Sequence, residues 1–180
     1  NEILSFAVRF YRSRVSEDDE AINLPSEDHI RQLPTGPAPK LIRFAAPQDQ
    51  IKWISDQIVR IVQKQKWQPD QILVLQEDSA QVDLCVQMIN QKMPGLAINA
   101  KEKGHLGKVR VCSINATTGL EAPLVFIAGL DRIFEQEDAL QNDPEDRPEM
   151  VLRNTRKIYM AITRAMSNLI IAYCKESVRD

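Results

Sequence analysis

Short apolar runs alternate with amphipathic helical segments along most of this chain, and this alternation constrains the fold more than any other feature. The strand-like runs lie at 41–45, 72–75, 96–100, 109–114, 124–130 and 169–173. Several of them, such as ILVL at 72–75, are apolar at every position, which is typical of strands buried on both faces. The pattern predicts an α/β fold: a mostly parallel sheet flanked by helices in a three-layer sandwich. Sites in such sheets usually lie at the carboxyl ends of the strands.

Apolar residues at helical spacing predict helices in the segments outside these strands. The opening segment places Ile3, Phe6, Ala7 and Phe10 on one face. Pro47 begins a second helix, and Ser79 caps a third. A fourth helix is expected from about Glu149 to Arg164, just before the last strand.

The length of 180 residues and the 43% hydrophobic content suit one domain spanning residues 1–180. Two acidic segments, at about 15–39 and 131–149, are expected to be irregular. Residues 16–28 and 131–149 each carry a net charge of −6, so the rest of the chain is net positive despite the overall charge of −2. This distribution is compatible with a nucleic-acid groove, and equally with a mixed, solvated surface.

The composition offers little sign of a metal site or a membrane segment. Cys85, Cys112 and Cys174 are far apart among apolar neighbours, which predicts reduced core residues of a cytoplasmic protein. The two histidines lie near no cysteine cluster, so no metal site is expected. No apolar run approaches the roughly 18 residues of a membrane span, so no membrane partner is expected.

The segment from Val109 to Leu130 is the first of two that depart from ordinary core patterning. A strand ends near Ser113, a loop of small polar residues follows, and Glu121 precedes the next strand. The backbone N–H groups and hydroxyls of such a loop can bind phosphate or sugar oxygens. A plain connection between strands is the alternative interpretation.

The second segment is the helical stretch that begins at Arg153. At the helical angle, its basic residues fall within an arc of about 100°, opposite an apolar face that packs on the sheet; they are Arg153, Arg156, Lys157 and Arg164. Such a stripe is often only a solvated face. Arg164, however, lies where the helix gives way to a strand, and its planar guanidinium suits an anion held by another domain.

In this order, the two segments resemble motifs of the UvrD/Rep-type superfamily 1 DNA helicases. TTGLEAPLVFIAGL is similar to motif V, and RKIYMAITRAMSNLIIAY is similar to motif VI. NEILSFAVRFY, LIRFAAPQDQIKWISDQI and ILVLQEDSAQ resemble further elements of the second motor domain, so the likeness covers most of the chain. It implies a RecA-like domain that completes an interlobe ATP site and contacts single-stranded DNA.

The resemblance also implies roles for individual residues. Arg164 matches the arginine finger that contacts the γ-phosphate of ATP, and it is the predicted catalytic residue. Glu121 matches the residue that contacts the ribose, with Gly119 allowing close approach. Ser113 and Asn115 occupy the positions that contact single-stranded DNA.

The motifs of this chain depart from the family pattern at several positions. Thr118 replaces a common lysine, Ala122 a common aromatic residue, and Asn115 a histidine, so ATP contact is better supported than the details of DNA contact. Tyr159 matches the motif VI tyrosine and is expected to pack in the core.

No G-x-x-x-x-G-K-[ST] sequence occurs in the chain. The family pattern implies that ATP and Mg²⁺ are held mainly by an N-terminal P-loop lobe, and that the chain alone is inactive. Only 16 residues separate Lys92 from Val109, which suggests a relative without the large accessory domain inserted there in UvrD and Rep. Two alternatives are a non-catalytic binding module with a degenerate helicase fold, and a standalone nucleotide-binding domain.

Overall fold

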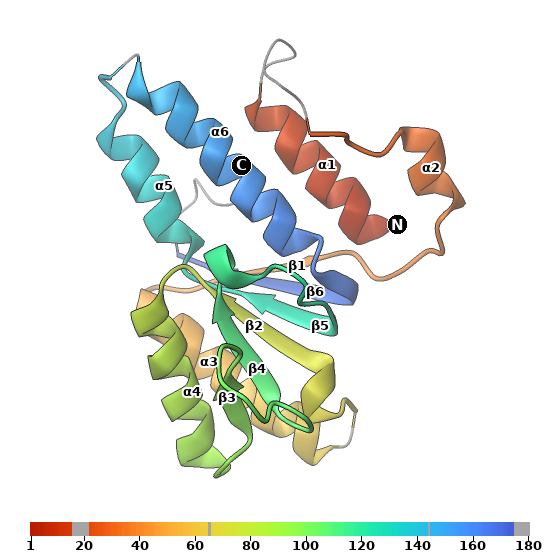
Figure 1. Cartoon of the computed structure of the whole chain (residues 1–180), viewed down its shortest axis with the longest axis vertical. Coiled ribbons are helices and arrows are strands. Elements are labelled where there is room, and N and C mark those ends of the chain that lie inside the picture. Colours follow the sequence, from red (N-terminus) through yellow and green to blue (C-terminus); the bar gives the residue numbers. More distant parts are fainter. Residues whose placement is uncertain (16–21, 65, 144, 175–180) are drawn as a thin grey trace.

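The computed structural model describes residues 1–15, 22–64, 66–143 and 145–174 (Figure 1). Its helices and strands, in chain order, are α1 (Glu2–Arg14), α2 (Glu27–Gln32), β1 (Lys40–Arg43), α3 (Pro47–Gln63), β2 (Ile72–Gln76), α4 (Ser79–Lys92), β3 (Ala97–Asn99), β4 (Val109–Ser113), β5 (Ala122–Ile127), α5 (Leu130–Ala139), α6 (Asp146–Ile162) and β6 (Ala165–Tyr173). Two 3₁₀ turns, η1 (Pro69–Gln71) and η2 (Ile114–Ala116), precede β2 and follow β4.

The strands form one six-stranded sheet in the order β1-β6-β5-β2-β4-β3, and every neighbouring pair is parallel. Helices α3 and α4 cover one face, whereas α1, α5 and α6 cover the other. This arrangement confirms the predicted α/β fold, a RecA-like three-layer sandwich with a parallel sheet.

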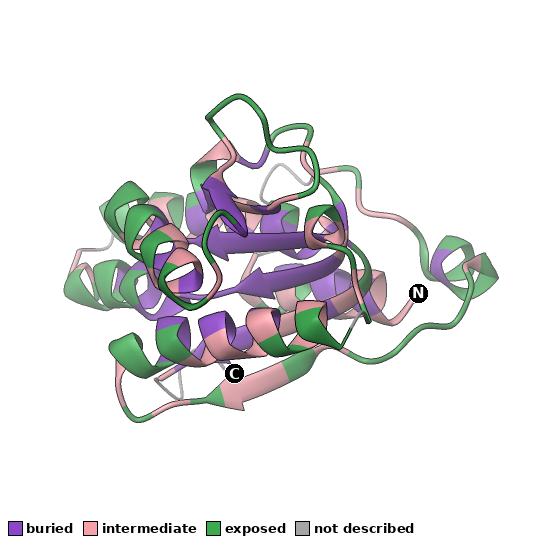
Figure 2. Ribbon diagram, turned by 90° about the horizontal axis from the view of Figure 1, so that it is seen from below, coloured by how far each residue is buried: buried purple, intermediate pink, exposed green. Residues whose placement is uncertain are grey.

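Strand β2 lies near the middle of the sheet and is buried at every position (Figure 2). Leu73 and Leu75 join the apolar cluster under α1, α5 and α6, whereas Ile72 and Val74 join the cluster under α3 and α4. Successive side chains of a strand point to opposite faces, so one strand supplies both cores. The uninterrupted apolar runs in the sequence therefore mark strands covered on both sides.

Several element boundaries differ from the sequence-based expectations. Asp78, not Ser79, caps α4, because its side chain accepts a hydrogen bond from the backbone N–H of Gln81 at 2.8 Å. Helix α6 ends at Ile162, so Arg164 is not part of the helical stripe and instead lies in the turn before β6.

The acidic segments contain more regular structure than predicted. The prediction that residues 131–149 are irregular is wrong, because α5 and the first turn of α6 occupy most of them. Leu130, Ile133 and Phe134 recur at helical spacing in α5 and are buried, while two of its four acidic residues, Glu135 and Asp138, are exposed. Helix α2 lies within 15–39, where Ser26 caps it and two acidic residues occupy its first turn. Residues 16–21 lie outside the described part of the chain.

A buried ionic cluster joins the three helices on the α6 side of the sheet. Arg14 of α1 donates to the carboxylate of Glu137 on α5 and to the hydroxyl of Thr155 on α6, the latter at 3.1 Å. The amide of Asn154 donates to the other oxygen of Glu137 at 3.0 Å. The guanidinium carbon of Arg14 also lies 4.7 Å from the ring centroid of Phe134. These contacts fix α1 against α5 and α6.

The three cysteines differ in burial, and Cys174 is less enclosed than predicted for a core residue. Burial raises the pKa of the Cys85 thiol to about 12 and that of Cys112 to about 11. Burial also raises the pKa of Cys174, but Cys174 is partly exposed whereas the other two thiols are buried, so iodoacetamide at neutral pH is expected to alkylate Cys174 first. Peptide mass spectrometry over a time course measures the order. Modification of Cys85 as fast as that of Cys174 in folded protein would contradict this burial pattern.

Candidate functional site

The register of two neighbouring strands brings Glu121 and Arg164 together. Ala122 at the start of β5 pairs with Ala165 at the start of β6. Since the strands are parallel, the residues that precede this pair also lie side by side. The backbone N–H of Ala122 donates to the carbonyl of Arg164 at 3.1 Å, which ties the two chain segments at this point.

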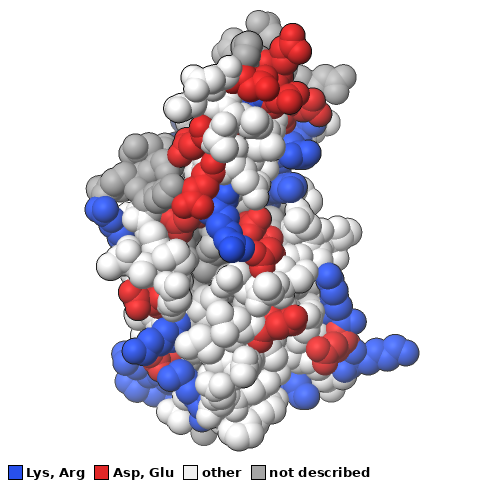
Figure 3. Space-filling model, turned by 90° about the vertical axis from the view of Figure 1, so that its left-hand side faces the viewer, with Lys and Arg blue, Asp and Glu red and all other residues white. Residues whose placement is uncertain are grey.

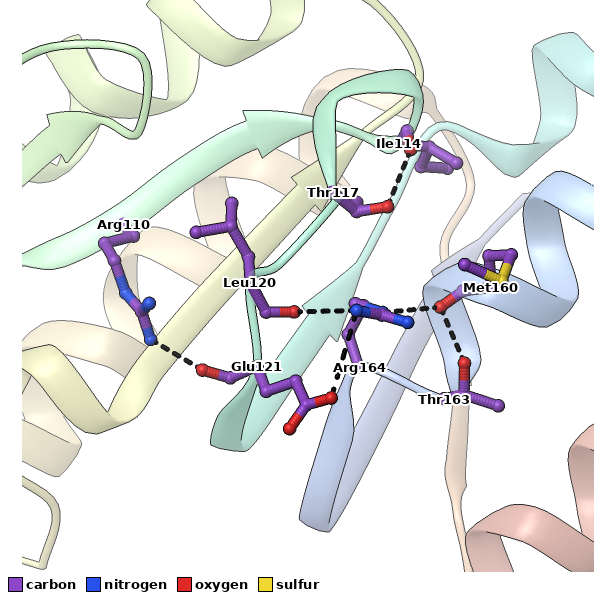
Figure 4. Close-up of polar contacts among 8 residues, drawn as sticks. All are labelled: Arg110, Ile114, Thr117, Leu120, Glu121, Met160, Thr163 and Arg164. Atoms are coloured by element: carbon purple, nitrogen blue, oxygen red, sulfur yellow. Dashed lines mark hydrogen bonds and ion pairs between the residues drawn. The ribbon is translucent and has the colours of Figure 1, made fainter.

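The Arg164 side chain is held against the backbone of both segments (Figure 4). Its Nε donates to the carbonyl of Met160 at 3.1 Å, and Nη1 lies 3.5 Å from the carbonyl of Leu120. Nη1 is also 3.9 Å from Oε1 of Glu121, and the side chains are 14% and 60% exposed respectively. Among the described residues, Nη2 makes no hydrogen bond, so one edge of the guanidinium remains available for an acceptor.

Arg110 supports the Glu121 segment from the other side, and sequence reasoning missed it. Its Nη2 donates to the backbone carbonyl of Glu121 at 2.8 Å and to that of Asp70 at 3.2 Å. The residues at 120 and 121 are thus held between two guanidinium groups, those of Arg110 and Arg164 (Figure 4). The signal was present in the sequence: Arg110 is the one charged residue in the strand VRVCS.

Gly119 lies in the turn that leads to Glu121. The N–H of Leu120 donates to the carbonyl of Thr117 at 3.0 Å, and Gly119 at the third turn position has φ of +75°. A positive φ at that position favours glycine. A Cβ on Gly119 would meet no atom of this chain within 4 Å, so the backbone conformation explains the glycine without any packing constraint.

The two sets of predicted site residues lie at opposite ends of their strands. Glu121 and Arg164 lie at the amino ends of β5 and β6, so the expectation of a site at the carboxyl ends is wrong for this pair. Ser113 and Asn115 do lie at the carboxyl end of β4. Ser113 is only 7% exposed, whereas Asn115 is exposed.

Asn115 and Thr118 face the basic side of α6 across a groove of about 530 Å³. The α6 wall carries Arg153, Arg156 and Lys157. The helical stripe predicted from the sequence therefore borders the loop after β4, while Arg164 lies beyond the end of α6. Thr117 contributes to the loop's shape, because its hydroxyl donates to the carbonyl of Ile114 at 3.1 Å.

Tyr159 packs in the core, as predicted. It is 8% exposed, and its ring meets that of Tyr11 edge-on at a centroid distance of 5.7 Å. Burial raises the pKa of its phenol, and the neighbouring Tyr11 adds to the shift. Its role is thus to join α1 to α6 near the Arg164 turn.

The donor set at the Glu121 and Arg164 pair suits an anion and a sugar hydroxyl: a guanidinium can donate to phosphate oxygens, and an exposed carboxylate can accept from a hydroxyl. Within the described residues, no group of three or more His, Cys, Asp or Glu side chains is placed to hold a metal ion. The same part of the chain has no helix long and apolar enough to cross a bilayer.

No protein-family model matches the sequence, and no curated protein matches it. Among solved structures, the chain is similar to the C-terminal domain of a possible DNA helicase from Lactobacillus plantarum WCFS1. The two share 15% sequence identity with a TM-score of 0.54, over 93% of this chain and 83% of that chain. At this identity the likeness is one of fold. The fold of this chain is therefore one that also occurs in the C-terminal domain of a possible DNA helicase.

Proposed function

We propose that this chain is the second motor domain of an ATP-dependent DNA helicase or translocase of the UvrD/Rep type. The observation that carries the proposal is the pairing of Arg164 with Glu121, 3.9 Å apart at the amino ends of β5 and β6. These are the residues that the resemblance to motifs V and VI marks as ATP contacts. The likeness in fold to the C-terminal domain of a possible DNA helicase supports the same conclusion.

Arg164 completes the ATP site from across a cleft between two lobes. Its backbone contacts hold the guanidinium at the surface with Nη2 available, and a γ-phosphate bound by the other lobe accepts from it. The guanidinium then stabilises the negative charge that develops on the phosphoryl oxygens during hydrolysis. Mg²⁺ supplies further charge neutralisation when bound, and its ligands belong to the P-loop lobe.

Glu121 and the loop after β4 provide the remaining contacts in this proposal, to the ribose and to DNA. The exposed carboxylate of Glu121 accepts from a ribose hydroxyl, and the turn at Gly119 leaves its approach open. Asn115, which is exposed, and Ser113, which is 7% exposed, contact single-stranded DNA at the carboxyl end of β4. The nucleotide contact lies at the amino end of β5, whereas the DNA contact lies at the carboxyl end of β4. Closure of the cleft on ATP can therefore shift this domain along the DNA strand.

In this proposal the domain supplies only half of the ATP site, the half that contains Arg164 and Glu121. We therefore expect that the 180-residue chain alone hydrolyses no ATP, and that hydrolysis stimulated by DNA appears only when a P-loop lobe is joined to it. Phosphate release by the chain alone, compared with the two-lobe protein, measures this directly. Turnover by the chain alone would instead support a standalone nucleotide-binding domain. A two-lobe protein that is folded but shows no turnover would support a non-catalytic binding module.

Glu121→Ala is expected to raise the KM for ATP of the two-lobe protein about tenfold and to change kcat little, because losing a hydrogen bond to a charged group costs about 1.5 kcal/mol. Steady-state ATPase kinetics give both constants. Glu102→Ala, an exposed carboxylate in the loop before β4, is the matched control and is expected to keep the wild-type KM. An unchanged KM in Glu121→Ala would remove the ribose contact from the proposal.

A further inference from the structure

The groove between α6 and the loop after β4 has the properties of a binding site that reaches beyond the motif V positions. Its volume of about 530 Å³ lies within the usual range for ligand sites, on the order of 300–1,000 Å³. One wall is the exposed part of the loop, with Asn115 and Thr118, and the other is the basic face of α6. Residues about forty positions apart in the sequence therefore converge on one hollow.

The charge of this groove is positive. Arg153, Arg156 and Lys157 line it from α6, and Glu149 is its single acidic residue. Arg153 and Lys157 are four residues apart on the helix, so their side chains lie one above the other on the same face. Lys157 also lies close enough to the carboxyl end of β2 for its charge to lower the pKa of Glu77, although burial leaves that pKa raised overall. Two cations stacked along a groove suit an extended polyanion.

The loop wall adds neutral hydrogen-bonding groups. The side chains of Asn115 and Thr118 are both exposed, and neither makes a hydrogen bond within the described residues. Thr117 is turned inward and holds the loop through its bond to Ile114. An amide and a hydroxyl opposite a row of cations are the groups that proteins commonly place on the phosphate and sugar of a nucleic acid.

The groove offers contacts to a nucleic-acid backbone but none for stacking a base. Its lining contains no aromatic ring, and its apolar members are Ile114, Leu152 and Met160. Proteins that hold single strands through their bases place aromatic side chains along the path. Binding here therefore depends on charge, which makes it tolerant of sequence and sensitive to salt.

We propose that Arg153 and Lys157 of α6 are direct contacts to the phosphodiester backbone of single-stranded DNA, so that the DNA site extends from Asn115 along this groove. The choice of DNA as the polyanion rests on the proposed function. Acidic side chains limit the path of the DNA strand at one end of the groove. Glu149 borders the groove there, and further exposed acidic residues lie at the tips of α5 and α6 (Figure 3). The strand therefore runs from Asn115 along the basic part of α6 and leaves before that end.

The test is a salt titration of DNA binding by the 180-residue chain. Fluorescence anisotropy of a labelled oligo-dT is measured from low to physiological salt for the wild type and for the double variant Arg153→Ala/Lys157→Ala. Each phosphate contact on a single strand contributes about 0.7 to the slope of log K against log salt, so the double variant is expected to lose about 1.4 of slope. Glu149→Gln is expected to strengthen binding, because it removes the acid at the groove.

The matched control is Arg9→Ala/Lys52→Ala, which removes two exposed cations from α1 and α3. It is expected to keep the wild-type slope, and circular dichroism checks that both double variants are folded. An unchanged slope in Arg153→Ala/Lys157→Ala, or no DNA binding by the wild-type chain at low salt, overturns the proposal. Poly-glutamate competing as well as unlabelled oligo-dT at equal charge also overturns it, in favour of an acidic protein partner.

This experiment separates the groove from the ATP half-site. Arg164→Ala is expected to leave DNA binding by the chain unchanged, because Arg164 lies beyond α6 at the amino ends of the strands. Loss of DNA binding in the groove variant with normal ATP turnover in Arg164→Ala would keep the groove and refute the arginine-finger role of Arg164 on which the motor proposal rests. The reverse pattern would keep the motor role and refute the groove.

Discussion

Arg164→Ala is expected to lower DNA-stimulated ATP hydrolysis about 10³-fold in the protein that joins this chain to its P-loop lobe, the lower end of the range for an arginine finger. That loss equals about 4 kcal/mol of transition-state stabilisation. The guanidinium is already positioned by the carbonyls of Met160 and Leu120, so alanine removes the charge together with its fixed direction. Steady-state phosphate release at saturating ATP and DNA measures kcat.

Three comparisons sharpen this experiment. Equilibrium ATP binding should persist in Arg164→Ala, because the P-loop lobe holds most of the nucleotide. Arg164→Lys keeps the charge but lacks the planar fork that bonds both carbonyls, so it is expected to restore only part of the rate. Arg9→Ala, on the exposed side of α1, is the matched control and should turn over ATP at the wild-type rate. A kcat near wild type in folded Arg164→Ala protein would refute the arginine-finger role.

Glu137→Ala is expected to lower the free energy of unfolding by about 3–5 kcal/mol, since it leaves one member of a buried ion pair without its partner. The Glu137 side chain is 5% exposed and that of Arg14 is 19% exposed. Water therefore hydrates the unpaired Arg14 guanidinium poorly and replaces little of the interaction with the lost carboxylate. The amide of Asn154, itself 2% exposed, also loses its acceptor. Urea unfolding followed by circular dichroism gives the change.

The neighbouring residue provides the control for that stability measurement. Asp138→Ala removes an exposed carboxylate from the same helix and is expected to change the stability by less than about 0.5 kcal/mol. Glu137→Gln keeps one acceptor oxygen and should fall between the two. Equal stabilities for Glu137→Ala and Asp138→Ala would show that the cluster does not hold α1 on the rest of the domain.

Hydrophobic pattern was sufficient to predict the class of fold. A strand such as β2, apolar at every position, has to be covered on both faces, so strands of this kind alternating with helices imply a three-layer sandwich. Helix α5 was missed because its exposed acidic residues hid the spacing of Leu130, Ile133 and Phe134. Charge on the outer face of a helix does not oppose helix formation, and the buried side should have decided the prediction.

The sequence by itself determined the layers of the fold and, through the resemblance to motifs V and VI, singled out Glu121 and Arg164. Only the tertiary structure decided that these residues are neighbours. They are 43 positions apart, and their contact depends on β5 pairing with β6 in the register that matches Ala122 to Ala165. The support from Arg110 and the groove at Asn115 likewise depend on which elements lie side by side. Local pattern specifies which residues are buried, whereas strand order and register arise from packing the whole sheet.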